Sequence, residues 1–211
     1  LSLNAWFAPP RHQGGKVIVL YHGNAGHIGD RAAKTRHFLD AGYGVYLCEY
    51  RGYGGNLGSL SEDGVYKDAR SALRWLDEHG YPASQWVIYG ESLGSGPAVQ
   101  MAMEFKARAM IIDGGFSSAV DVAGDRYFWL PVSWLLKDRY DNISKIKSIQ
   151  ASLLMIHGDE DRVVPHSLGK KLFEAANDPK TMVTIQGGGH SDLYEKHDAA
   201  KPVLDWLVNL P

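Results

Sequence analysis

The stretch that decides the fold runs from Gln85 to Val99 and reads Gln-Trp-Val-Ile-Tyr-Gly-Glu-Ser-Leu-Gly-Ser-Gly-Pro-Ala-Val. Its first part is an apolar, β-prone run, and its last part contains small residues compatible with a helix. Ser92 lies between them, with Gly90 and Gly94 two residues away on either side. This G-x-S-x-G spacing is typical of a serine on a tight strand-to-helix turn, where larger neighbours would collide with backbone. The stretch therefore predicts a strand, a sharp turn that exposes the Ser92 hydroxyl, and a helix.

The G-x-S-x-G spacing alone is weak, because a chain with 24 glycines also produces it by chance at ordinary turns. The flanking strand and helix favour a catalytic serine. Two further small residues, Gly96 and Ala98, predict that the helix packs closely on the sheet, with its N-terminus at a site of developing negative charge.

Composition restricts the class of protein. At 211 residues, 45% hydrophobic and 22% charged, the chain has the profile of one globular domain with a sizeable core. The formal net charge of -2, with scattered Lys and Arg, argues against nucleic-acid binding. Cys48 is the only cysteine and lies in an apolar run, which predicts a buried thiol and excludes an intrachain disulfide.

No run approaches the roughly 18 apolar residues of a membrane span, and no signal-peptide pattern begins the chain. The chain starts at Leu1, close to strand-like sequence and without an initiator methionine. We therefore expect a cytoplasmic or membrane-associated protein, in the second case through an N-terminal anchor missing from this sequence.

Strand-like and helix-like segments alternate along the chain. The expected strands cover residues 3–7, 16–21, 45–50, 86–89, 109–113, 152–156 and 182–185. Helical patterns fall between them and after the last strand, with acidic residues at the start of the helix that opens at Ser61. This alternation is typical of a doubly wound, mostly parallel α/β sheet, here in a single domain of residues 1–211.

A serine hydroxyl is a poor nucleophile near neutral pH, so Ser92 needs a base, and the base needs an acid. In parallel sheets such groups come from loops at the carboxyl ends of strands. His190 follows the last expected strand, and the three glycines before it would let the loop bend toward Ser92. His157 and His166 are less favoured alternatives for the base.

The acid must come from the loop after residues 152–156. Asp159 and Asp161 both follow that strand, as does Glu160, and spacing alone barely separates them. With either aspartate the chain order is nucleophile, acid, histidine, which is the order in α/β-hydrolases. An oxyanion would need two donors, for which we expect the backbone N–H groups of Leu93 and Asn24.

Several histidines and carboxylates could also suggest a metal site. The histidines concerned are His22, His27, His157 and His190. No tight ligand spacing such as H-E-x-x-H is present. We therefore expect neither a metal nor another cofactor.

Five motifs together resemble the α/β-hydrolase superfamily. They are Tyr21–Gly26, Tyr50–Gly54, Gly90–Gly94, His157–Pro165 and Gly189–His190. The closest resemblance is to the serine-hydrolase branch that includes eukaryotic membrane-associated protein depalmitoylases and their bacterial relatives. It implies an α/β-hydrolase fold with Asp161 as the acid, His190 as the base, and Asn24 and Leu93 as oxyanion donors.

The chain departs from that family pattern in two places. After Gly54 the family usually continues with a polar pair that contains serine, whereas this chain has Gly55 and Asn56. The first antiparallel strand of the family is also expected to be missing at the N-terminus.

Residues 117–147 interrupt the alternation of strands and helices, and the segment is too long for a plain crossover. Its apolar cluster comprises Tyr127, Phe128, Trp129, Leu130, Trp134 and Leu135. We expect a small cap whose apolar face binds an acyl chain, with Tyr127, Phe128, Trp129 and Trp134 as substrate-binding residues. An ordinary helix on the sheet, plain core and a membrane-touching surface remain alternatives.

These residues predict a serine hydrolase that cleaves carboxylic esters or thioesters of short to medium acyl chains through an acyl-enzyme on Ser92. Its partner would be a small ester or an acylated substrate. A peptidase of the same fold is an alternative, but the chain lacks an obvious anionic pocket for a peptide terminus. A non-catalytic binding module of this fold is another, although such modules usually lack a member of the triad.

Overall fold

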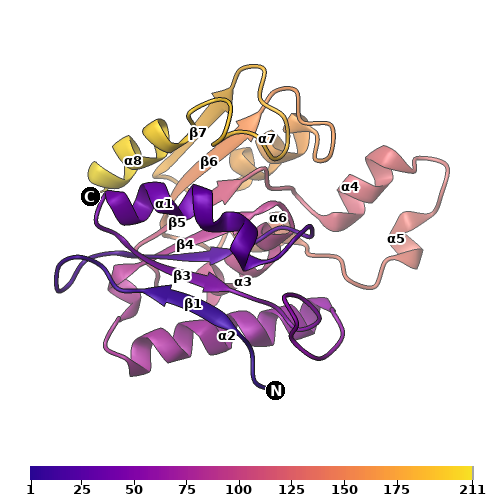
Figure 1. Ribbon diagram of the computed structural model, residues 1–211. Coiled ribbons are helices and arrows are strands. Elements are labelled where there is room, and N and C mark those ends of the chain that lie inside the picture. The colour runs from indigo at the N-terminus through magenta and orange to yellow at the C-terminus, as the bar shows by residue number, and fades with distance from the viewer. Residues whose placement is uncertain (211) are drawn as a thin grey trace.

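Seven strands form one sheet in the computed structural model, which describes residues 1–210 (Figure 1). The strand order is β1-β3-β2-β4-β5-β6-β7, with β1 antiparallel to β3 and all other neighbours parallel. The strands are β1 (Ala5–Ala8), β2 (Val17–Tyr21), β3 (Gly44–Cys48), β4 (Trp86–Glu91), β5 (Ala109–Asp113), β6 (Ser152–Gly158) and β7 (Lys180–Ile185). The order reverses at β2, which pairs with β3 on one side and β4 on the other. Ligands bind at such a switch point, outside the carboxyl ends of the strands.

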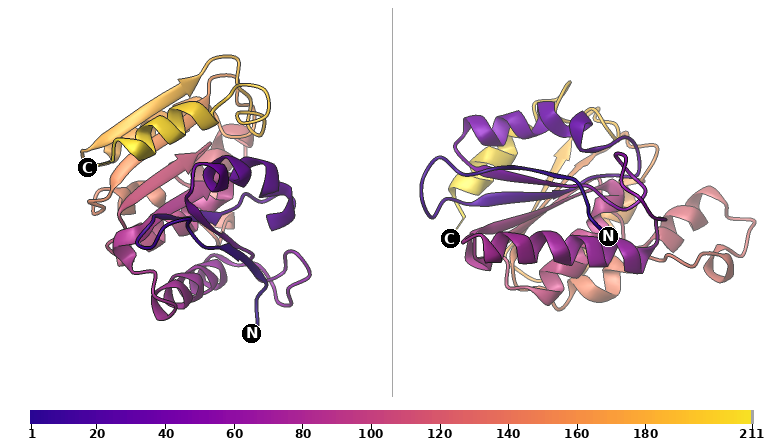
Figure 2. Two further views of the ribbon diagram at one scale, coloured as in Figure 1. Left: turned by 60° about the vertical axis from the view of Figure 1, so that its left-hand side comes forward. Right: turned by 60° about the horizontal axis from the view of Figure 1, so that its bottom comes forward.

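Helices cover both faces of the sheet (Figure 2). The α-helices are α1 (Ala32–Asp40), α2 (Glu62–Glu78), α3 (Ser95–Glu104), α4 (Ala119–Arg126), α5 (Val132–Leu135), α6 (Asn142–Ile146), α7 (His166–Ala175) and α8 (Ala200–Val208). Short 3-10 turns η1 (Ile28–Arg31), η2 (Ala83–Gln85) and η3 (Ser92–Gly94) precede α1, β4 and α3. Helices α1 and α8 lie on one face, while α2, α3, α6 and α7 contribute to the core on the other.

The central strands are buried on both faces, which explains their continuous apolar sequences. Along β2, Val17 and Val19 belong to the core beneath α2 and α3, whereas Ile18 and Leu20 belong to the core beneath α1 and α8. All five residues of β2 are fully buried. Truncating a side chain such as Leu20 to alanine would therefore cost about 2–5 kcal/mol of stability.

The predicted α/β-hydrolase fold is confirmed, and each expected strand is present with ends shifted by a few residues. The prediction that the family's antiparallel strand is missing is wrong for this chain. Strand β1 pairs with β3, with Ala5 opposite Cys48. Phe7 anchors this edge strand, because its ring packs edge-on against Trp75 and Tyr81, with centroids 5.2 Å and 5.0 Å apart. Cys48 is buried, as its apolar surroundings predicted.

Part of the segment 117–147 stands out from the body of the molecule (Figures 1 and 2). We call residues 119–136, which carry α4 and α5, the arm. Helix α6 instead packs beside α3 and α7, so the end of the segment is an ordinary helix of the layer on the sheet. Within the described residues 1–210, no helix combines the length and apolar character needed to cross a membrane.

Candidate active site

Ser92 occupies a strained turn at the carboxyl end of β4. Its φ is 50°, in the left-handed region that non-glycine residues rarely adopt. A Cβ on Gly90 would lie 2.6 Å from the Cβ of Ala98, and one on Gly94 would overlap the carbonyl oxygen of Tyr21. The glycines of G-x-S-x-G are therefore required by contact with neighbouring elements, as the sequence predicted.

Gly96 has a different role from the predicted one. A Cβ at this position would overlap the ring of Tyr140, which packs against the start of α3 from the segment before α6. Gly96 therefore makes room for an aromatic side chain and not for the sheet. Ala98 is the residue of α3 that lies directly on Gly90 of β4.

Replacing Gly94 with alanine should destabilise the protein by at least about 3 kcal/mol, because the new methyl group has no space beside Tyr21. Urea unfolding measures this loss. The matched control is Gly124→Ala in α4, where the nearest atom to a new Cβ is 3.7 Å away. That variant should be neutral or slightly stabilising, and equal losses in the two variants would contradict the steric explanation.

Three side chains from three strand-end loops form one hydrogen-bonded chain. The Ser92 hydroxyl Oγ lies 2.8 Å from Nε2 of His190, and Nδ1 of His190 lies 2.7 Å from Oδ2 of Asp161. The other carboxylate oxygen, Oδ1, accepts the backbone N–H groups of Val163 and Val164 at 2.8 Å and 2.9 Å. The structure thus brings together the three residues that the sequence and the family resemblance predicted as nucleophile, base and acid.

Close backbone contact explains how His190 reaches the site. The glycines before it allow the loop after β7 to approach the end of β6. A Cβ on Gly158 would overlap the carbonyl oxygen of Gly188, and Gly187 has a φ of 69°. Bulkier residues would separate these two loops and, with them, His190 from Asp161.

The structure places the alternative residues elsewhere. Asp159 is exposed and its Oδ1 accepts the backbone N–H of Gly187 at 2.7 Å. His166 bonds to the hydroxyl of Thr184 at 3.0 Å. Glu160 is exposed, and His157 contacts Asp161 and not Ser92.

Charge and burial set the protonation of the acid and the base. Burial would raise the pKa of Asp161, but hydrogen bonds from His157, His190 and the Val164 N–H hold it well below its usual range. Burial would lower the pKa of His190, but the hydrogen bond and charge of Asp161 raise it above 6.5. The charges of Asp113 and Glu91 act in the same direction.

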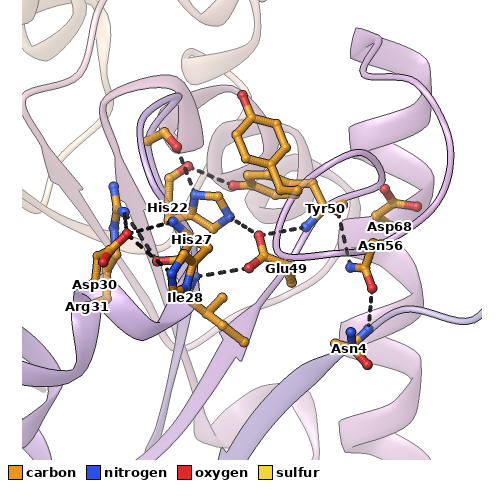
Figure 3. Close-up of polar contacts among 12 residues, drawn as sticks. Asn4, His22, His27, Ile28, Asp30, Arg31, Glu49, Tyr50, Asn56 and Asp68 are labelled. Atoms are coloured by element: carbon orange, nitrogen blue, oxygen red, sulfur yellow. Dashed lines mark hydrogen bonds and ion pairs between the residues drawn. The ribbon is translucent and has the colours of Figure 1, made fainter.

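The loop after β2 lies directly beside Ser92. A Cβ on Gly23 would be 3.3 Å from the Cβ of Ser92. His22 is fully buried at the base of this loop, with Nδ1 2.8 Å from its neighbour's carbonyl oxygen and Nε2 2.7 Å from Oε1 of Glu49 (Figure 3). Because a carbonyl oxygen can only accept, Nδ1 carries a proton. The pair fixes the loop that carries the backbone N–H of Asn24.

The Tyr50–Gly54 motif braces the same loop from β3. The hydroxyl of Tyr50 donates to the carbonyl of His22 at 2.9 Å, and that of Tyr53 donates to Oδ1 of Asn24 at 2.6 Å. Asn56, at the departure from the family pattern, bonds through its side-chain amide to the carbonyl of Tyr50 at 3.2 Å. The residues of this motif therefore support the loop beside Ser92.

A buried charge network, which the sequence patterns did not predict, surrounds Glu91, the residue before Ser92. Glu91 pairs with Arg31 at 2.5 Å and with Lys34 at 2.6 Å, and Lys34 also bonds Asp113 at 2.7 Å. Burial would raise the pKa of Glu91, but these two cations lower it to about 2. A cleft of about 290 Å³ beside His190 is lined in part by this network. The sequence contained one sign of this network, because Glu91 ends an otherwise apolar strand. A charged side chain that is buried there needs a partner of opposite charge.

The expected apolar pocket under the arm is not formed. Phe128 and Trp134 are 82% and 90% exposed, and Tyr127 and Trp129 are also exposed. Helices α4 and α5 pack mainly on each other and leave these rings without a covering surface. Leu93 instead borders a small apolar cluster, whose buried members are Tyr66, Phe116, Tyr140 and Val164.

A strained serine turn, with an acid and a histidine on later strand-end loops, defines a protein of the α/β-hydrolase superfamily. Residues 12–137 match the family described as serine aminopeptidase, S33, and the chain belongs to this family of hydrolases.

Similar proteins span most of the chain. An uncharacterized protein of Mycobacterium tuberculosis is 37% identical over 194 residues, which cover 91% of this chain and 69% of that protein. Human alpha/beta hydrolase domain-containing protein 17B is 30% identical over 184 residues, 84% of this chain and 61% of the human protein. The solved monoacylglycerol lipase of Paleococcus ferrophilus superposes with a TM-score of 0.78 at 20% identity, with both chains fully covered. This last likeness shows the fold alone.

Proposed function

We propose that the protein is a serine hydrolase that cleaves carboxylic esters or thioesters through a covalent acyl-enzyme. The observation that carries this proposal is the hydrogen-bonded chain from Ser92 through His190 to Asp161. His190 Nε2 takes the proton of Ser92 as Oγ attacks the carbonyl carbon, and it then protonates the leaving group. Water attacks the acyl-enzyme in the second half of the reaction, with His190 again as the base.

The tetrahedral intermediate carries a negative oxygen that needs fixed donors. We assign this role to the backbone N–H groups of Leu93 and Asn24. The close approach of Gly23 to Ser92 and the bracing of the loop by Glu49 and Tyr53 support the second donor.

An aminopeptidase is the second candidate, because the matching family carries that description. A peptide N-terminus is a cation and needs an unpaired carboxylate near the nucleophile. In the cleft beside His190, Glu91 and Asp113 are paired with cations. Asp30 and Glu195 line the same cleft; Asp30 lies 3.9 Å from Arg31, and Glu195 makes no ion pair within residues 1–210. The pairing of Glu91, the carboxylate next to Ser92, supports ester or thioester cleavage, whereas Glu195 is the carboxylate that an aminopeptidase would use.

A substrate panel separates these candidates. Nitrophenyl esters, acyl thioesters and aminoacyl nitroanilides should be compared by kcat/KM with the same enzyme preparation. We expect turnover of the first two classes and little of the third. Preferential cleavage of the aminoacyl nitroanilides would establish the aminopeptidase instead, and no turnover with any class would favour a binding module.

We further propose that the acyl chain starts on the apolar cluster beside Leu93 and extends toward the arm. The partly buried members of this cluster include Leu93 and, on α4 of the arm, Ala119 and Val122, so an apolar path leads from Leu93 to the arm. The exposed rings of Trp129 and Trp134 are free to contact the part of the chain beyond it.

A Trp129→Ala/Trp134→Ala double variant should lower kcat/KM about tenfold for an eight-carbon acyl ester, because contacts with two or so methylenes are lost. Acetyl ester turnover should stay unchanged. The control is Trp6→Ala, which removes a half-exposed tryptophan from β1. Identical chain-length profiles in the double variant and the wild type would exclude a role of the arm in acyl binding.

The pH profile should reflect the raised pKa of His190. The base must be neutral to accept the Ser92 proton, so kcat/KM falls as the pH drops through this pKa. Because Asp161, Asp113 and Glu91 raise the value, the midpoint of the acidic limb should lie above 6.5. A profile of acetyl ester hydrolysis from pH 5 to 9 measures it, and a midpoint at or below 6.5 would contradict this electrostatic description.

A further inference from the structure

A second imidazole contacts the acid of the triad. His157, on β6, is fully buried, and its Nε2 lies 3.2 Å from Oδ2 of Asp161. The same carboxylate oxygen lies 2.7 Å from Nδ1 of His190. Two imidazoles from different strand ends therefore share one oxygen of Asp161.

The neighbours of His157 determine where its proton lies. Nε2 also lies 2.9 Å from the carbonyl oxygen of Val164, so both of its neighbours are acceptors and Nε2 carries the hydrogen. Nδ1 is buried and has no hydrogen-bond partner within residues 1–210. It faces Gly169 of α7, where a Cβ would overlap it. A buried nitrogen without a partner costs about 1–3 kcal/mol, so packing alone gives no reason for a histidine here.

We propose that His157 is a positioning residue for the reaction, one that holds the Asp161 carboxylate and limits how strongly it acts on His190. This inference rests on the proposed function. The Val163 and Val164 N–H groups hold Oδ1. The His157 N–H bonds to the Val164 carbonyl and has Oδ2 as a second acceptor at 3.2 Å, so it opposes rotation of the carboxylate away from His190.

The same contact weakens the acid as an acceptor. The His157 N–H neutralises part of the charge on Oδ2, which leaves less for His190. Without this donor, Asp161 would bind the His190 proton more strongly and make His190 a less available base near neutral pH.

The other charged or titratable groups near His157 and Asp161 make contacts that do not depend on His157. His190 is also under the influence of Asp113 and Glu91, both of which are held by Lys34. The His166 ring lies 5.3 Å from that of His157 but bonds to Thr184. Replacing His157 therefore changes one contact of the acid and leaves the other charges in place.

The test uses His157→Phe, which removes the donor, and His157→Gln, whose amide can replace it at a similar position. In His157→Phe we expect kcat to fall at least about tenfold with KM unchanged within twofold, since only orientation is altered. The acidic limb of kcat/KM should move to higher pH, and His157→Gln should restore much of both. If His157 only stabilised the fold, its replacement would lower the amount of active enzyme but would not move the acidic limb of the kcat/KM profile.

A matched control from the neighbouring ring keeps the test independent of folding. His166→Gln changes the neighbouring ring and should leave the limb in place. An unmoved limb in folded His157→Phe, or an equal shift in His166→Gln, would overturn the inference.

A titration of His190 by NMR separates this inference from the proposed function, because it needs no substrate. The pKa of His190 should be higher in His157→Phe than in the wild type. If it is higher while the wild type hydrolyses no ester, His157 acts on the acid as inferred and the proposed function is wrong. If it is unchanged in an active enzyme, the inference is wrong and the proposed function stands.

Discussion

Ser92→Ala should lower kcat for ester hydrolysis by about a millionfold, the largest effect expected of any single substitution in this chain. Within the described residues 1–210, the hydroxyl is the one group on the strained turn that hydrogen-bonds His190. Without it no acyl-enzyme forms, and the residual rate comes from substrate binding and oxyanion stabilisation alone. Steady-state hydrolysis of a nitrophenyl ester measures the loss.

The matched control for this variant is Ser191→Ala. Ser191 follows His190 and lines the adjacent cleft, yet its hydroxyl makes no hydrogen bond with Ser92, His190 or Asp161 in residues 1–210. Its removal should leave kcat within a few-fold of the wild type. Comparable turnover by Ser92→Ala and Ser191→Ala would exclude Ser92 as the nucleophile.

Asp161→Asn should lower kcat about ten-thousandfold with little change in stability to urea. The amide can still accept at one atom, but its NH2 group facing Nδ1 forces His190 into the tautomer that cannot take the Ser92 proton. The measurement is kcat for the same ester, with circular dichroism to verify the fold.

Asp159→Asn is the control from the same loop. Its side-chain oxygen can still accept the N–H of Gly187, so turnover should remain within a few-fold of the wild type. If Asp159→Asn were the more damaging of the two, the assignment of the acid would be reversed.

Sequence patterns predicted the sheet well, for a physical reason. Strands such as β2 and β5 are buried on both faces and so appear as uninterrupted apolar runs. The turn at Ser92 was equally predictable, because Gly90 and Gly94 are required by contacts with Ala98 and Tyr21.

The acid and its surroundings were harder to predict. Asp159 and Asp161 follow the same strand, and spacing does not reveal that one side chain turns to Gly187 and the other to His190. The family resemblance, not the spacing, selected Asp161. The role of His157 depends on a contact across its own loop and had no signal in the sequence.

The position of the arm could not be predicted from the sequence. Its aromatic residues indicate apolar contact, but the sequence does not specify which surface they meet. In the structure, Phe128 projects from the turn between α4 and α5 and Trp134 projects from α5, and these two short helices pack mainly on each other and not on the sheet. Composition therefore identified an unusual segment without giving its position relative to Ser92.

The central claim is that Ser92 is an activated nucleophile, and labelling with a fluorophosphonate tests it most directly. The folded wild type should gain one adduct in its intact mass, and peptide mapping should place that adduct on Ser92. Ser92→Ala and heat-denatured protein should remain unlabelled. An unlabelled folded wild type, or an adduct on another residue, would contradict the proposed serine hydrolase.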